Sequence, residues 1–122
     1  MGTSFIEYKE FGFWSRDNFI ESWLTTLLAE MQSAPMLEKW QKSLIDDWLI
    51  QGTTGSGWFL GLDKYLIDAQ RKDSLLSLAK RALKFSDPLG RETGELFIKL
   101  LEGQLETNES SPIDYLHWPE EH

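Results

Sequence analysis

Residues 52–58 are the first place in this chain where residue types and spacing point to chemistry. The stretch Gly-Thr-Thr-Gly-Ser-Gly-Trp approaches the phosphate-binding loop GxxxxGK[ST]. That motif needs a lysine to neutralise the phosphates and a hydroxyl residue to bind magnesium, but Trp58 and Phe59 occupy these two positions. We therefore predict no nucleotide site. We expect a connector between helices, with Gly55 and Trp58 available to contact a partner.

Two adjacent carboxylates, Asp46 and Asp47, precede this loop. Paired carboxylates can bind a metal or act as an acid and a base, but neighbouring positions on a helix do not face each other. The chain has no Glu-x-x-His motif, and the nearest further carboxylates are Asp63 and Asp68. Helical-wheel geometry puts Asp46 in solvent and Asp47 at the border of the core. We predict no metal and no cofactor, and we treat both residues as candidates for contact with a partner.

Residues for nucleophilic catalysis are scarce. The chain has no cysteine, which excludes thiol catalysis, zinc–thiolate sites and disulfides. Its two histidines, His117 and His122, lie in a proline-bounded C-terminal segment, which is a poor platform for a catalytic triad. We therefore expect a protein that is not an enzyme.

The charge of the chain indicates what kind of partner it would attract. The net charge is −8, with four bases against nine acids in residues 1–63 and six acids but no base in residues 102–122. Such a protein repels nucleic acid and attracts basic proteins, so we predict a basic protein partner and no nucleic acid. Glu102, Glu106 and Glu109 are the partner-binding candidates of this acidic tail. The basic stretch 71–99 is interpreted as its electrostatic complement.

The sequence also bears on location. No apolar run approaches the roughly 18 residues that a membrane span needs, and the N-terminus lacks the bases and apolar stretch of a signal peptide. We therefore expect a cytoplasmic protein that does not interact with a membrane.

Hydrophobic periodicity predicts the elements that would position these residues. Apolar residues recur at helical spacing in five segments, and no hairpin signal is present. Trp23, Trp40 and Trp48 fall on the predicted inner faces. The sequence thus predicts an all-α fold in which about five amphipathic helices form a compact bundle. The expected helices cover residues 15–32, 35–50, 58–71, 73–85 and 92–103.

These elements predict one domain over residues 1–122. It would comprise an extended N-terminal arm (1–14), a helical core (15–103) and the acidic tail (104–122). Together with the charge, this favours a non-catalytic acidic protein-binding domain, a class that includes bacterial immunity proteins and antitoxins. Two alternatives remain open. One is a small ligand-binding or enzymatic helical domain with a pocket near Asp47 and residues 52–58, and the other is a homodimeric structural subunit.

Overall fold

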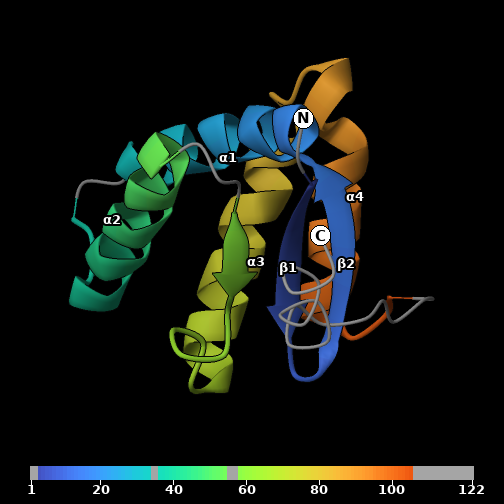
Figure 1. Cartoon of the computed structure of the whole chain (residues 1–122). Coiled ribbons are helices and arrows are strands. Elements are labelled where there is room, and N and C mark those ends of the chain that lie inside the picture. Colours follow the sequence, from blue (N-terminus) through green and yellow to red (C-terminus); the bar gives the residue numbers. More distant parts are fainter. Residues whose placement is uncertain (1–2, 34–35, 55–57, 106–122) are drawn as a thin grey trace, which may run out of the picture.

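The computed structural model describes residues 3–33, 36–54 and 58–105. Within these ranges the chain forms four helices and three strands, so the predicted all-α bundle of about five helices is wrong. The strands make one sheet in the order β2-β1-β3 (Figure 1). In chain order the elements are β1 (Thr3–Tyr8), β2 (Phe11–Arg16), α1 (Asp17–Gln32), α2 (Lys39–Thr54), β3 (Phe59–Gly61), α3 (Ala69–Leu83) and α4 (Pro88–Glu102).

The predicted N-terminal arm is instead an antiparallel hairpin of β1 and β2. Its turn consists of Lys9 and Glu10, whose φ angles are 50° and 68°. Positive φ at both central residues is the geometry of a type I′ turn, which usually contains Asn-Gly or another glycine pair. The pair Lys-Glu carries no such signal, which is why the sequence did not reveal the hairpin.

Replacing Glu10 with glycine is therefore expected to stabilise the fold. Glycine adopts positive φ without the cost that a side chain imposes there, although it also loses more entropy on folding. The net gain should be about 0.5–1 kcal/mol in the free energy of unfolding, measured by denaturant titration. The matched control, Glu95→Gly in the exposed middle of α4, should lose a similar amount. A loss of stability in Glu10→Gly would contradict the assignment of this turn.

The expected helix over residues 58–71 is also wrong. Residues 59–61 form β3, which pairs in parallel with β1. The amide of Phe5 donates to the carbonyl of Trp58 at 3.0 Å, and the amide of Leu62 donates to the carbonyl of Glu7 at 2.9 Å. The connection from β1 to β3 runs through α1 and α2, as parallel strands require a long crossover. A three-residue strand with a partner more than fifty residues away leaves too little local pattern to recognise.

Helix starts differ from the predictions because of the capping residues. Asp68 accepts the amide of Arg71 at 2.9 Å, so α3 begins at Ala69 rather than after Asp73. Asp87 caps α4 in the same way and is followed directly by Pro88, so this helix begins earlier than the predicted residue 92. Ser15, the first residue of the helix expected over 15–32, lies instead in β2, and its hydroxyl is hydrogen-bonded to that of Thr93 at 2.8 Å.

Two helix ends have the features that their residue types favour. Asp17 occupies the first turn of α1, where its negative charge suits the helix dipole. Gly103 ends α4 in the left-handed conformation at φ 72°.

The Asp87 cap predicts a dependence of stability on pH. Hydrogen bonds from the Ser22 hydroxyl and the Gly90 amide lower the pKa of Asp87 below its ordinary value of 3.8. A lowered carboxyl pKa stabilises the fold above the unfolded value, and this contribution is lost as the pH falls through the folded pKa. Asp87→Ala should lower the melting temperature at neutral pH, with a difference from wild type that shrinks as the pH falls below the ordinary value of 3.8. Asp87→Asn, which keeps a capping oxygen, should lose less.

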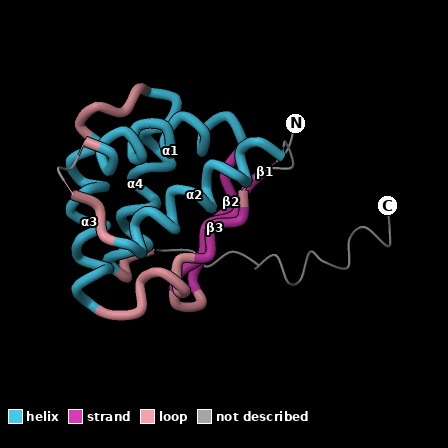
Figure 2. Tube along the Cα trace, turned by 90° about the vertical axis from the view of Figure 1, so that its left-hand side faces the viewer, coloured by secondary structure: helices cyan, strands magenta, loops and turns pink. Residues whose placement is uncertain are grey.

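The core lies where the helices pack on one face of the sheet (Figure 2). Trp23, Trp40 and Trp48 are buried there, as predicted. The helices α1 and α4 approach so closely that a Cβ atom on Gly94 would lie 2.6 Å from the ring of Trp23. The opposite face of the sheet carries Phe5 and its neighbours, so β1 buries aromatic side chains on both faces.

Candidate functional site

Three carboxylates and an aromatic ring surround a hollow of about 360 Å³ where the β3 edge of the sheet meets α2. We call this the acidic hollow. Glu7 comes from β1, Asp47 from α2, Phe59 from β3, and Asp63 from the loop that follows β3. Its residues are Glu7, Asp47, Gln51, Phe59, Gly61, Asp63 and Lys64.

Asp47 is held in place by two neighbours in the loop after β3. The hydroxyl of Tyr65 donates to Asp47 Oδ2 at 3.1 Å, and Lys64 Nζ lies 3.4 Å from the same oxygen. Partial burial and the hydrogen bond to Asp47 raise the pKa of Tyr65. The Asp47 side chain remains 31% exposed, so one oriented carboxylate is still accessible from the hollow.

Glu7 and Asp63 form the other side of the acidic hollow. Both carboxylate oxygens of Asp63 accept the backbone amide of Lys9 at 3.1 Å, which ties the hairpin turn to the loop after β3. Partial burial, together with the negative charge of Asp63, raises the pKa of Glu7. Among the residues that line the hollow, only Lys64 opposes the three carboxylates, so the site has an excess of negative charge.

The ring of Phe59 forms an apolar wall beside these carboxylates. It is 46% exposed and stacks on Phe5, with ring centroids 6.3 Å apart. Trp14 packs on Phe5 at 4.9 Å, so the three rings run across the outer face of the sheet. The amide of Phe59 donates to Gln51 Oε1 at 2.7 Å, which joins β3 to α2. An exposed aromatic ring next to accessible carboxylates suits contact with a side chain that is both cationic and planar.

The structure places the predicted partner-binding residues in several locations. Asp47 lines the acidic hollow, and Asp46 is exposed on α2 beside it. Trp58 is partly buried, and its indole donates to the Trp48 carbonyl at 3.1 Å. Glu102 pairs with Lys80 at 2.9 Å and lines a different cavity. The remaining candidates lie outside the described residues; they are Gly55, Glu106 and Glu109.

Sequence reasoning did not assign Glu7 and Phe59 to this site. Glu7 falls in the expected N-terminal arm (1–14), and Phe59 falls in the helix expected over residues 58–71. The two residues lie on neighbouring strands because Phe59 pairs with Phe5, two positions before Glu7. Such a juxtaposition depends on the parallel pairing of β1 and β3, and no local signal encodes it.

The residues of the ligand-pocket alternative line two different cavities in the structure. Asp47 lines the acidic hollow, whereas Gly52 and Trp58 line a separate cavity of about 490 Å³ between α1 and α2. Within residues 3–33, 36–54 and 58–105, no group of three or more His, Asp or Glu residues is arranged to hold a metal ion. The two histidines lie outside these ranges.

Comparisons with known proteins found no relative of this chain. The chain matches no protein-family model, no curated protein and no solved structure. In the part of the chain that the structure describes, no helix has the length and apolar character to cross a membrane.

Proposed function

We propose that this protein is a non-catalytic binding domain that presents the acidic hollow to a basic protein, as an immunity or antitoxin-type inhibitor does. The observation that supports this best is the convergence of Glu7, Asp47 and Asp63 beside the exposed ring of Phe59. An arginine of the partner suits this arrangement. Its planar guanidinium can bind a carboxylate with two hydrogen bonds and stack on an aromatic face.

Electrostatics favour a cationic occupant. Partial burial and, to a smaller extent, repulsion from the negative charge of Asp63 raise the pKa of Glu7. A guanidinium in the hollow would relieve this repulsion, and the net charge of −8 would speed the encounter with a basic partner. Because exposed charges are screened by salt, the affinity should fall as ionic strength rises.

The test begins with immobilised wild-type protein and cell extract from its own source. A true partner is basic, is retained by wild type, and is lost by the variant Asp47→Arg at low salt. Its affinity is then measured with purified components at increasing salt. The control Glu95→Arg makes the same charge change on the exposed side of α4, outside the hollow, and should retain the partner. The proposal fails if every retained protein binds both variants equally, or if binding does not weaken with salt.

Glu7 gives a prediction that links stability to binding. A raised carboxyl pKa means that the folded state holds the proton more tightly, so stability falls as the pH rises from the ordinary value of 4.5 through the folded pKa. Glu7→Gln should therefore raise the melting temperature at neutral pH and weaken the binding of a basic partner. Melting curves from about pH 4 to about pH 8 should show the stability difference growing with pH. A difference that is constant with pH, or a destabilised variant at neutral pH, would contradict this view of the site.

A further inference from the structure

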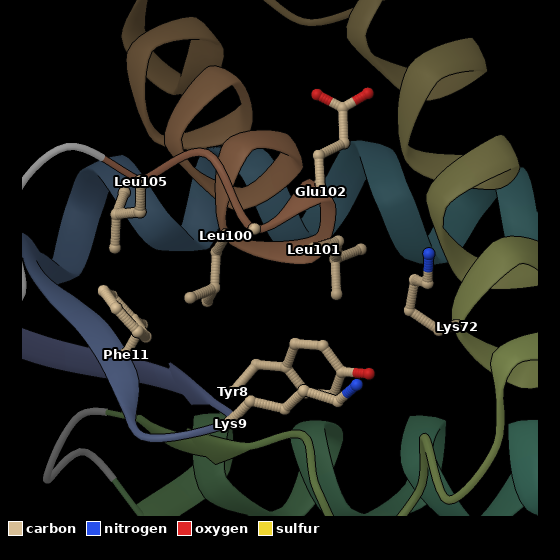
Figure 3. Close-up of a pocket in the computed structure, with 9 residues that line it drawn as sticks. Tyr8, Lys9, Phe11, Lys72, Leu100, Leu101, Glu102 and Leu105 are labelled. Atoms are coloured by element: carbon tan, nitrogen blue, oxygen red, sulfur yellow. The ribbon is translucent and has the colours of Figure 1, made fainter.

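A second cavity, of about 310 Å³, lies between the hairpin turn, the end of α4 and the start of α3 (Figure 3). We call it the hairpin groove. The residues on which the argument rests are Tyr8, Lys9, Phe11, Lys72, Leu100 and Leu105.

The groove combines apolar walls with positive charge. Figure 3 shows leucines of the α4 end facing Tyr8 and Lys9 across the gap, with Lys72 at one end and Phe11 at the other. Phe11 is 48% exposed, which is unusual for a large aromatic side chain beside other apolar residues. The lining therefore suits an occupant with apolar side chains.

The charges around the groove favour an acidic occupant. Lys9 Nζ lies 5.4 Å from the centre of the Tyr8 ring. Lys72 pairs with Asp73 at 2.9 Å, but Asp73 is 67% exposed, and such surface pairs contribute little. The carboxylate of Glu102 is paired with Lys80 at 2.9 Å. Two ammonium groups are thus available to an incoming carboxylate.

We infer that the hairpin groove is the docking site for residues 113–118 of the same chain, Ile-Asp-Tyr-Leu-His-Trp. Leu105, which lines the groove, is the last residue before the segment 106–122. The seven residues 106–112 can span up to about 24 Å when extended, enough to bring residues 113–118 back across the groove. The tether also gives the segment an effective concentration of about millimolar, so a modest affinity suffices.

The composition of the segment complements the groove. Residues 113–118 offer Ile113, Tyr115, Leu116 and Trp118 to the apolar walls, and Asp114 to the lysines. Residues 106–122 contain five acids and neither lysine nor arginine, so the whole segment is attracted to Lys9 and Lys72. The proposal is independent of the acidic hollow, which shares no residue with the groove.

The absence of native cysteine permits a direct test in the full-length chain. A nitroxide spin label is attached to Glu120→Cys, just beyond the proposed docking residues. In the nuclear magnetic resonance spectrum, the backbone amides of Tyr8, Lys9 and Phe11 should lose most of their intensity, and reduction of the label should restore it. If these three amides keep their intensity, the inference is overturned, whatever broadening occurs elsewhere in the chain.

A mixed sample separates docking within one chain from docking between copies. Protein that is enriched in ¹⁵N but carries no spin label is combined with spin-labelled protein of natural isotope content. Broadening of the same amides in this mixture would show that the groove binds a second copy, which contradicts the proposal. Their full intensity in the mixture supports it.

Charge variants test the lysines. Lys9→Glu/Lys72→Glu should abolish the broadening, whereas the matched control Lys39→Glu/Lys42→Glu, on the exposed surface of α2, should leave it unchanged. Adding Asp114→Lys to the first pair should restore it. If the double variant does not fold, the spin-labelled Glu120→Cys protein with both lysines intact provides the test. Its broadening should weaken at about 1 M salt, where electrostatic interactions extend over only about 3 Å. Equal broadening in both pairs, or at all salt concentrations, refutes a role for the lysines.

Discussion

Replacing Phe97 with alanine is expected to lower the free energy of unfolding by about 3–5 kcal/mol, a large part of the stability of a typical domain. Phe97 is fully buried in α4 and lies between two tryptophans. Its ring centroid is 5.7 Å from that of Trp23 in α1 and 6.5 Å from that of Trp48 in α2. Losing this ring would leave a cavity at the point where three helices meet, and rigid neighbouring rings cannot easily fill it.

Denaturant unfolding followed by circular dichroism measures this effect. The control Phe85→Ala removes the same ring from a site that is 72% exposed, and should change stability by less than about 0.5 kcal/mol. Similar losses in the two variants would contradict the central position of Phe97. A loss below about 1 kcal/mol for Phe97→Ala would do the same.

Replacing Asp47 with lysine is expected to weaken binding to the basic partner about 100-fold, which corresponds to about 2.7 kcal/mol. The change removes the carboxylate that Tyr65 orients and puts a like charge where the partner's cation would enter. Stability should change by less than about 1 kcal/mol, because Lys64 is 63% exposed and ion pairs near solvent contribute little.

Titration calorimetry with the purified partner measures this loss, and a melting curve confirms that the variant is folded. Glu95→Lys makes the same charge change on α4, outside the acidic hollow, and should reduce affinity by less than about threefold. Equal losses in the two variants would mean that only net charge matters, and the hollow would then have no special role.

Helical periodicity predicted the parts of the fold that depend on neighbours in sequence. The inner faces of α1 and α2 follow from apolar residues that are spaced three and four positions apart. The inward positions of Trp23 and Trp48 follow from the same rule. These features could be predicted because the interactions that create them are local.

The sequence did not predict the strands because buried and exposed side chains do not alternate along β1. Phe5 on the outer face and Ile6 on the inner face are both almost completely buried, so β1 shows no alternation of polar and apolar residues. Phe5 is covered by Trp14 and Phe59, which come from two other strands. The turn at Lys9 and Glu10 hides the hairpin further, since neither residue is a typical choice for positive φ.

The acidic hollow likewise combines one feature that the sequence predicts locally with one that depends on residues far apart in the chain. Helical-wheel geometry placed Asp47 correctly at the border of the core, because its position depends on α2 alone. Its grouping with Glu7 and Asp63 depends on the parallel pairing of β1 with β3, which are separated by two helices. The carboxylates were visible in the sequence, but their convergence was not.

The amino-acid sequence by itself thus determined an acidic, cysteine-free chain with amphipathic helices and a tryptophan-rich core. Only the tertiary structure decided that residues 3–16 and 59–61 form a sheet, and that carboxylates from three separate elements meet beside Phe59. The physical reason is the range of the interactions. Helical hydrogen bonds and capping join residues three or four positions apart, whereas the pairing of β1 with β3 joins residues more than fifty positions apart.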